Sequence, residues 1–175
     1  MLPEKADRKQ NTLSGKGECV FLALGSNLGD RAGHLENAIA GLKAGGFCVE
    51  KVSSFYETPP VDCEAGTGPF LNGVLQGIWQ GSAESLLDLC QNLERQEGRP
   101  EIHSSRQSRT LDLDLILFGG HCIHTGRLII PHPRALIRQF VLKGLVMISP
   151  DIVFPDSGKT ASDLLAERIA KEGEL

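Results

Sequence analysis

Apolar and polar positions follow each other along the first half of the chain in blocks of clear period. Val20–Leu24 is an apolar run that ends at a Gly-Ser-Asn turn, which predicts a strand. Apolar residues then recur at helical spacing and predict a helix over about 30–43, which a pair of glycines ends. Residues 47–58 are rich in β-branched and aromatic side chains. They predict a second strand, which two prolines end.

The middle of the chain predicts one more strand and one more helix. Residues 70–79 alternate in character, so Phe70 and Asn72 share one face of the predicted strand. Ser82 is a suitable N-cap for the helix that follows, because its hydroxyl can accept from the free amides of the first turn. Gly98 is a suitable stop for that helix.

The remaining segments add a loop, a strand and further C-terminal elements. Residues 99–109 are polar and lack periodicity, which indicates a mobile loop, and residues 110–118 predict a fourth strand. Gly119–Gly120 is predicted to start a hairpin. We expect helices over 133–145, opened by a proline, and over 162–170.

The order strand, helix, strand, strand, helix, strand predicts the fold class. It is typical of an α+β protein with a ferredoxin-like βαββαβ core, here with an additional C-terminal hairpin and helices. Residues 1–18 are polar and are interpreted as a flexible N-terminal extension, and residues 19–175 as a single domain.

Composition narrows the class of protein. The net charge of −4 argues against a dedicated nucleic-acid binder. No apolar run approaches the roughly 20 residues of a membrane helix, so we expect no membrane partner. The 5 cysteines are an odd number and form no C-x-x-C pair, which favours a reducing, cytoplasmic location.

Charge is unevenly distributed. From Arg95 to Arg138 the chain has seven arginines, no lysine and four acids, which makes this segment net positive inside an acidic protein. The use of arginine without lysine favours bidentate hydrogen bonding of phosphate by guanidinium groups. A solvated basic face is the alternative interpretation.

The sharpest local motif is a pair of acids in the fourth predicted strand. Asp112 and Asp114 are two residues apart, so their carboxylates share one face, while the leucines between and beside them point into the core. Two adjacent carboxylates repel each other unless a cation lies between them, and Mg²⁺ prefers carboxylate oxygens together with water and phosphate. A structural salt-bridge cluster with Arg109 is the alternative. Nucleotidyltransferases also use such a pair, but they place a Gly-Ser turn shortly before it, and here Gly25-Ser26 lies far upstream.

Other candidate motifs are weaker. Gly158-Lys159-Thr160 lacks the earlier glycine of a P-loop, because Val153 stands there, so it is interpreted as a turn. His121 and His124 are interpreted as surface residues. For His132, between two prolines, a phosphate or ribose contact and a structural role are both open.

Several stretches together resemble one family, that of 6-hydroxymethyl-7,8-dihydropterin pyrophosphokinase, a folate-pathway enzyme. These are Ala23–Leu28, Ser53–Pro60, Phe70–Asn72, Gly98–Arg99, Arg109–Asp114 and Arg127 through Pro131-His132. They run in the family's order over about 19–156, and the family's fold is ferredoxin-like. The resemblance implies transfer of a pyrophosphoryl group from ATP to the pterin alcohol, with AMP released. Arg106-Gln107-Ser108 departs from the family pattern in the loop before Arg109.

The resemblance also implies roles for individual residues. Asp112 and Asp114 match the pair that holds two Mg²⁺ ions, and Arg99 and Arg109 match the catalytic arginines. The positions that match the pterin pocket are Thr58, Pro59, Val61, Phe70, Asn72 and Phe140. Those that match the ATP site are Gln91, Glu94, Arg109, Leu115, Arg127, Ile129, His132 and Arg138.

Two other functions compete with this one. Another metal-dependent phosphotransferase or nucleotidyltransferase would release ADP or pyrophosphate from ATP, where the pyrophosphokinase releases AMP. An RNA-binding module would need exposed aromatic residues on its sheet and a positive net charge. The single Trp, the single Tyr and the net charge of −4 argue against that module.

Overall fold

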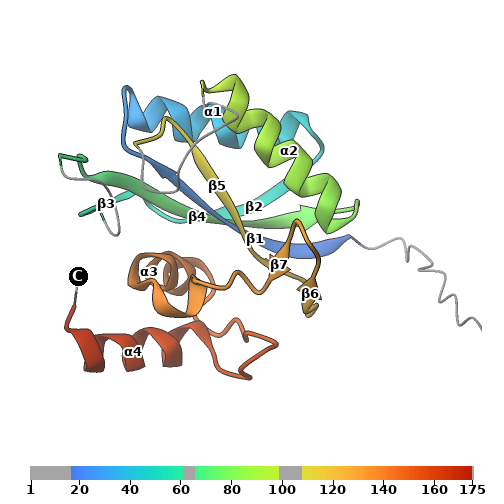
Figure 1. Cartoon of the computed structure of the whole chain (residues 1–175). Coiled ribbons are helices and arrows are strands. Elements are labelled where there is room, and N and C mark those ends of the chain that lie inside the picture. The colour runs from blue at the N-terminus through green and yellow to red at the C-terminus, as the bar shows by residue number, and fades with distance from the viewer. Residues whose placement is uncertain (1–16, 61–65, 99–107, 175) are drawn as a thin grey trace, which may run out of the picture.

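The computed structural model describes residues 17–60, 66–98 and 108–174. Its centre is an antiparallel sheet with the strand order β2-β4-β1-β5, and β3 pairs with β4 beside β2 (Figure 1). The five strands are β1 (Glu18–Ser26), β2 (Cys48–Val52), β3 (Tyr56–Thr58), β4 (Phe70–Trp79) and β5 (Asp112–Phe118). The protein is therefore a mixed α+β structure.

Helices cover both faces of this sheet. Helices α1 (Arg31–Ala44) and α2 (Ala83–Gln96) lie on one face, and α3 (Gln139–Ile148) and α4 (Ala161–Glu172) lie on the other (Figure 1). None of the helices in the part of the chain that the structure describes is long and apolar enough to cross a membrane. Because helices cover both faces of the sheet, the central strand β1 is buried on both sides.

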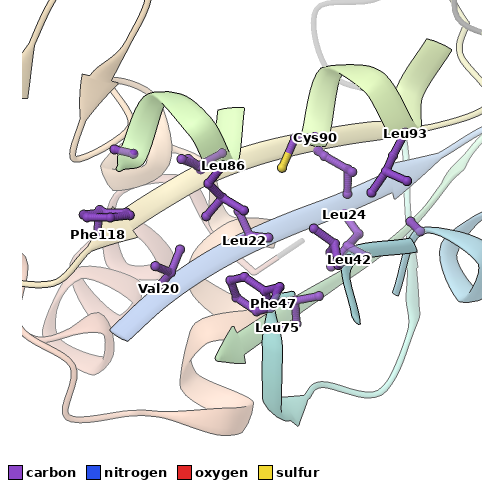
Figure 2. Packing of buried hydrophobic residues seen from close by; sticks show 14 of the residues in the cluster. Val20, Leu22, Leu24, Leu42, Phe47, Leu75, Leu86, Cys90, Leu93 and Phe118 are labelled. Atoms are coloured by element: carbon purple, nitrogen blue, oxygen red, sulfur yellow. The ribbon is translucent and has the colours of Figure 1, made fainter. Parts of the chain in front are cut away.

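The first core lies between the sheet and the α1–α2 layer. Figure 2 shows Leu22, Leu75, Leu86 and Phe47 packed together there, and Leu22, Leu75 and Leu86 have no exposed surface. Burial of a Leu or Phe side chain contributes about 1.5–3 kcal/mol. This core holds α1 and α2 against the strands β1, β4 and β5.

The second core lies between the sheet and the α3–α4 layer. Phe21, Val74, Ile116 and Phe154 meet there, and neighbouring residues of β1 thus face opposite cores. This alternation is the reason that β1 reads as a continuous apolar run in the sequence.

Most of the predicted elements are confirmed. The strand predicted over 70–79 is β4 with the same bounds. Ser82 caps α2, since its Oγ accepts from the amide of Ser85 at 3.1 Å. Gly98 follows α2 with φ +90°, a conformation that glycine adopts without strain.

The strand predicted over 47–58 is in fact two strands, β2 and β3. Ser53 divides them: its amide donates to the carbonyl of Val74 at 2.8 Å, and its hydroxyl accepts from the amide of Val74 at 3.0 Å. A side chain therefore replaces a backbone group in the ladder at this point, and the periodicity of the sequence does not show it.

The predicted C-terminal hairpin is present, but its predicted starting point is wrong. It does not begin at Gly119–Gly120, because β6 (Ile123–His124) pairs with β7 (Ile129–Ile130) and not with β5. The amide of Gly119 donates instead to the carbonyl of Cys19 in β1 at 2.7 Å.

The helix predicted over 133–145 is displaced. Residues Ala135–Ile137 form a single 3₁₀ turn, and Arg138 is extended with φ −101° and ψ 103°, so α3 begins only at Gln139. This break places Arg138 and Phe140 at the start of a helix rather than within one.

Candidate functional site

The two acids of the motif lie at the start of β5. Asp112 is opposite Gly25 and Asp114 is opposite Ala23 in the neighbouring strand β1. Their common face is confirmed, because Leu111, Leu113 and Leu115 all lie in the core on the other side of the sheet. The small residues of β1 leave space beside the two carboxylates.

Cationic side chains surround the acids. Arg109 Nη1 lies 2.9 Å from Asp112 Oδ2, and Arg138 Nη1 lies 3.7 Å from Asp114 Oδ2. His132 Nε2 lies 3.8 Å from Asp114 Oδ1. The structure thus brings together Arg109, His132 and Arg138, three positions that the family resemblance assigned to ATP, around the predicted metal ligands.

Burial and neighbouring charges shift the pKa values of two residues in this cluster, Asp114 and His132. Burial, and then the charge of Asp112, raise the pKa of Asp114 from 3.8 to about 6, against the opposing effect of the arginines 109, 134 and 138. Burial, and then Arg138 and Arg134, lower the pKa of His132 from 6.5 to about 4. His132 is therefore neutral near pH 7.

The neutral ring of His132 has a defined tautomer. The amide of Arg134 donates to His132 Nδ1 at 3.2 Å, so the ring proton is on Nε2. That N–H is directed to the side of Asp114. A neutral donor of this kind suits an anionic oxygen.

Glu94 supports the acids from the helix behind them. It is almost fully buried on α2, and its Oε1 accepts from the amide of Leu113 at 2.8 Å. Leu113 stands between the two aspartates. Glu94 therefore fixes β5 against α2 at the position of the candidate site.

A cavity of about 310 Å³ adjoins Asp114. Four predicted ATP residues line it, namely Leu115, Arg127, Ile129 and His132. Arg127 also forms an exposed ion pair with Asp88 of α2, at 2.6 Å. Gln91 is a half-buried residue of α2 and is not part of this lining.

A second cavity, of about 80 Å³, lies between β3, α3 and α4. Three predicted pterin residues line it, namely Thr58, Pro59 and Phe140. Asn72 is buried, and its Nδ2 donates to Thr58 Oγ1 at 2.7 Å. Phe70 is opposite Thr58 in the β3–β4 pairing. Five of the six predicted pterin positions are thus close together.

The sequence reasoning missed Asn27. Its amide donates to the carbonyl of Arg109 at 3.1 Å, and its Oδ1 accepts from the amide of Arg109 at 2.7 Å. Its Nδ2 also donates to Ser108 Oγ at 3.1 Å. Asn27 follows β1 directly, so the turn after β1 holds the backbone of the candidate catalytic arginine. The Gly-Ser-Asn turn was visible in the sequence, but nothing there indicated its partner.

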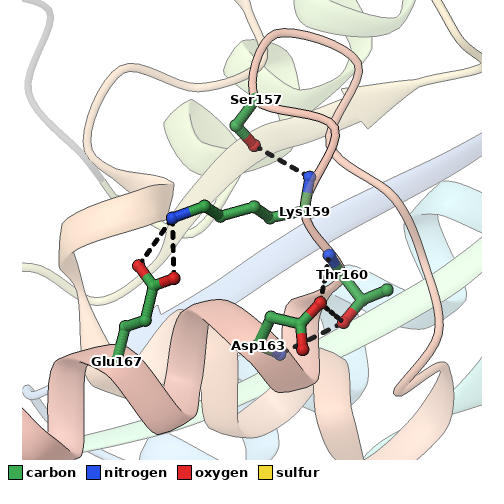
Figure 3. A network of polar contacts seen from close by, with 5 residues as sticks. All are labelled: Ser157, Lys159, Thr160, Asp163 and Glu167. Carbon is green, nitrogen blue, oxygen red and sulfur yellow. Dashed lines mark hydrogen bonds and ion pairs between the residues drawn. The ribbon is translucent and has the colours of Figure 1, made fainter.

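The Gly158-Lys159-Thr160 motif has a structural role. Lys159 pairs with both carboxylate oxygens of Glu167, and Thr160 forms a capping box with Asp163 at the start of α4 (Figure 3). The prediction of a turn is borne out. His121 and His124 are exposed, as predicted, and His121 lies 3.2 Å from Glu18.

Several predictions fall outside the described residues: Val61 of the predicted pterin pocket, the predicted catalytic Arg99, Arg106 and Gln107, and most of the predicted mobile loop and N-terminal extension. Within 17–60, 66–98 and 108–174, no group of three or more His, Cys, Asp or Glu side chains could hold a metal ion. A cation at Asp112 and Asp114 would therefore need further oxygen ligands from a substrate or water.

A family model and several relatives match this chain, and they come from one enzyme family or from proteins of folate synthesis. The family model described as 7,8-dihydro-6-hydroxymethylpterin-pyrophosphokinase matches residues 21–150. The chain is 41% identical, over 76% of its length and 79% of the relative, to the 2-amino-4-hydroxy-6-hydroxymethyldihydropteridine pyrophosphokinase of Bacillus subtilis. It is 38% identical over 81% of its length to the folic acid synthesis protein fol1 of Pneumocystis carinii.

Some of these relatives are much longer. The chain spans 19% of the Pneumocystis carinii protein and 26% of a folate synthesis bifunctional protein of Arabidopsis thaliana. Among solved structures, the HPPK-DHPS protein of Plasmodium falciparum with pteroate is similar, with a TM-score of 0.72. That likeness covers 89% of this chain and 45% of the other at 13% identity, so it concerns the fold alone.

Proposed function

Because the chain belongs to the 7,8-dihydro-6-hydroxymethylpterin-pyrophosphokinase family, we propose that it transfers a pyrophosphoryl group from ATP to 6-hydroxymethyl-7,8-dihydropterin. The products are AMP and the pterin diphosphate, an intermediate of folate biosynthesis. The strand order and the alternation of strands and helices support a ferredoxin-like classification of the core. The free cysteines 19, 48, 90 and 122 support a reducing, cytoplasmic location.

One observation carries the proposal: a chain of contacts links the two cavities through the acids. Asp114 lines the larger cavity, and its carboxylate is 3.7 Å from Arg138. The guanidinium of Arg138 lies 5.5 Å from the ring centroid of Phe140, which lines the smaller cavity. A nucleotide in the larger cavity and a flat heterocycle at Phe140 would thus meet at the acids.

Two Mg²⁺ ions are the proposed cofactors, held by Asp112 and Asp114. The pKa of Asp114 is raised by burial and by the neighbouring Asp112 in spite of the nearby arginines, so a divalent cation beside it would further favour the charged carboxylate. When bound, the metal supplies positive charge to the triphosphate. Arg109 pairs with Asp112, and in this proposal it turns to phosphate when a cation takes its place at that carboxylate.

The remaining chemistry belongs to residues of the chain. The carbinol oxygen of the pterin attacks the β-phosphorus of ATP and loses its proton to water, and the bond from the β-phosphorus to the α,β-bridging oxygen breaks, so that this oxygen leaves with AMP. Arg109 and Arg138, with the Nε2–H of neutral His132, offset the negative charge that develops on the phosphoryl oxygens. Arg99 is proposed as a further catalytic arginine, and Gln91, Glu94, Leu115, Arg127 and Ile129 as parts of the ATP site.

The pterin pocket is proposed at the smaller cavity. Thr58 lines this cavity, and Asn72, which is buried next to it and is not part of the lining, donates to the Thr58 hydroxyl. An amide and a hydroxyl suit the hydrogen-bonding edge of a pterin. Phe70 and Phe140 offer aromatic faces for its ring. Pro59 and Val61 are the other proposed contacts.

Product analysis tests the reaction. The full chain is incubated with ATP, Mg²⁺ and 6-hydroxymethyl-7,8-dihydropterin, and the nucleotide products are separated. We expect AMP in amounts equal to the pterin diphosphate, and none when Mg²⁺ or the pterin is left out. ADP or free pyrophosphate as the product would contradict the proposal and favour a different phosphotransferase or a nucleotidyltransferase.

A further inference from the structure

The hydroxyl of Tyr56 is inserted at the first turn of α3. It donates to the carbonyl oxygen of Phe140 at 2.6 Å. Burial raises the pKa of Tyr56, while a hydrogen bond from the backbone of Gly144 acts to lower it. The hydroxyl is therefore protonated throughout the usual working range and acts as a permanent donor to Phe140.

Gly144 makes this contact possible. A Cβ atom at that position would lie 2.5 Å from the Tyr56 hydroxyl oxygen and 2.4 Å from Val74 Cγ2. Glycine in a helix costs about 1 kcal/mol relative to alanine, so its presence inside α3 has a packing reason. That reason is the close approach of Tyr56 and β4 to the helix.

The contact joins two walls of the smaller cavity. Tyr56 is two residues before Thr58 on β3, and Phe140 is the second residue of α3. Tyr56, Thr58 and Phe140 all line the cavity, and the Tyr56 hydroxyl is already used as the donor to Phe140. The bond from Tyr56 thus fixes the separation between the strand that carries Thr58 and the helix that carries Phe140.

Phe140 is then held at two points. Tyr56 fixes its backbone, and Arg138 lies 5.5 Å from the centroid of its ring. Arg138 is in turn 3.7 Å from Asp114. The position of the Phe140 ring relative to the acids therefore depends on both contacts.

We propose that Tyr56 is a positioning residue for the pterin, because its hydroxyl holds Phe140 at the distance from Thr58 that a flat heterocycle needs. This inference rests on the proposed function. Tyr56 acts through Phe140 and does not take part in the chemistry. It makes the pocket ready before the pterin enters, which reduces the ordering cost of binding.

Tyr56→Phe removes the hydroxyl and keeps the ring. We expect the pterin Kd, measured by calorimetry with Mg²⁺ and a non-hydrolysable ATP analogue present, to rise about tenfold. The Kd of the ATP analogue itself should stay at the wild-type value. The kcat at saturating pterin should also stay close to wild type, so that the effect appears in KM.

Ser162→Ala is the matched control. It too removes a hydroxyl that donates to a backbone carbonyl, that of Pro150 at 3.0 Å, but it does so at the start of α4 and away from the smaller cavity's lining. Its pterin Kd should equal that of wild type.

The possible results distinguish a failure of the proposed function from a failure of the positioning role of Tyr56. If the wild-type chain releases no AMP, the proposed function fails. If wild type releases AMP and Tyr56→Phe binds the pterin as wild type does, the positioning role is overturned. It is overturned equally if Tyr56→Phe weakens the ATP analogue as much as the pterin, or if Ser162→Ala weakens the pterin to the same extent.

Discussion

At the scale of single residues, Asp112 and Asp114 carry the strongest expectation. Asp112→Asn and Asp114→Asn should each abolish turnover at ordinary Mg²⁺ concentration, because each removes a charge from a site proposed to hold two divalent ions against a triphosphate. Steady-state AMP release measures this. Near-normal turnover in either variant would rule out the two-metal proposal.

Asp114→Asn should also stabilise the metal-free protein. The pKa of Asp114 is raised from 3.8 to about 6, so the folded state binds more protons than the unfolded chain between about pH 4 and 6. The stability of wild type therefore falls as pH rises across that window. Asn does not titrate, so the gain in free energy of unfolding of Asp114→Asn over wild type should be full above about pH 6 and should fade toward pH 4. Urea unfolding in EDTA at several pH values measures it, and an advantage that grows toward pH 4 would contradict the assignment.

His132 gives a pH prediction of opposite sign. Its pKa is lowered from 6.5 to about 4, because burial and the arginines 134 and 138 disfavour the charged ring. A depressed histidine pKa means that stability is full above pH 6.5 and is lost as pH falls toward 4. Metal-free wild type should therefore lose stability relative to His132→Gln over that range.

Nuclear magnetic resonance can follow the same histidine directly. The ring carbon and proton signals of His132, assigned by their absence in His132→Gln, should show no shift of the size that ring protonation produces between pH 5.5 and 8. Deprotonation of Asp114, 3.8 Å away with a pKa of about 6, should give only a small shift that is lost in Asp114→Asn. A full-sized shift near pH 6.5 that persists in Asp114→Asn would mean that His132 is not held neutral in the fold.

The sequence predicts residue positions on a shared face better than it predicts contacts. The spacing of Asp112 and Asp114 determines their common face, because the side-chain period of a strand is two. Asn27 and Tyr56 could not be assigned in the same way. Their partners, Arg109 and Phe140, are more than eighty residues away along the chain, and only the folded structure brings them together.

At the scale of elements, the turn between β1 and α1 holds the segment before β5. Asn27 forms three hydrogen bonds with Ser108 and Arg109. Asn27→Ala removes the two that its side chain makes and should free the backbone of Arg109. We therefore expect a lower kcat, by about tenfold, with Mg²⁺ affinity unchanged.

A double-mutant cycle tests whether Asn27 acts through Arg109. Arg109→Ala alone should lower kcat by about 10²–10³, as expected for loss of a donor to the developing charge. If Asn27 only positions that arginine, the double variant should be no slower than Arg109→Ala. Additive losses in the cycle would show that the two residues act independently.

Element boundaries were predictable where a local signal marks them. Ser82 and Gly98 mark the ends of α2 because caps are local in sequence. The division between β2 and β3 depends on the Ser53 hydroxyl meeting Val74, and the start of α3 depends on the extended backbone of Arg138. Both boundaries depend on tertiary contacts or on backbone conformation, which the spacing of apolar residues in the sequence does not predict.

At the scale of the whole molecule, two cores share one sheet. Phe21 and Leu22 of β1 face opposite layers, so loss of packing on one face must be felt on the other. The sequence predicted helices at both ends of the chain, but it did not indicate which face of the sheet each would cover. Both faces of β1, β4 and β5 carry buried apolar residues, so the hydrophobic pattern of the strands alone does not decide this choice.

A single tryptophan makes this coupling measurable. Trp79 packs against the α1–α2 core and stacks with Phe47, at a ring-centroid distance of 6.4 Å. Phe154 is fully buried in the α3–α4 core, on the other face. Phe154→Ala should lower the free energy of unfolding by about 3–5 kcal/mol, because it leaves a cavity in a packed core.

If the two cores unfold together, that change should appear equally in two probes. The urea midpoint from Trp79 fluorescence and the midpoint from far-ultraviolet circular dichroism should fall by the same amount in Phe154→Ala, with the slope m unchanged. Leu42→Ala, in the core beside Trp79, is the matched control and should also shift both probes together. A fluorescence midpoint that stays at its wild-type value in Phe154→Ala, while the dichroism midpoint falls, would mean that the α3–α4 layer unfolds on its own. The wall of the smaller cavity that carries Phe140 would then open independently of the acids on β5.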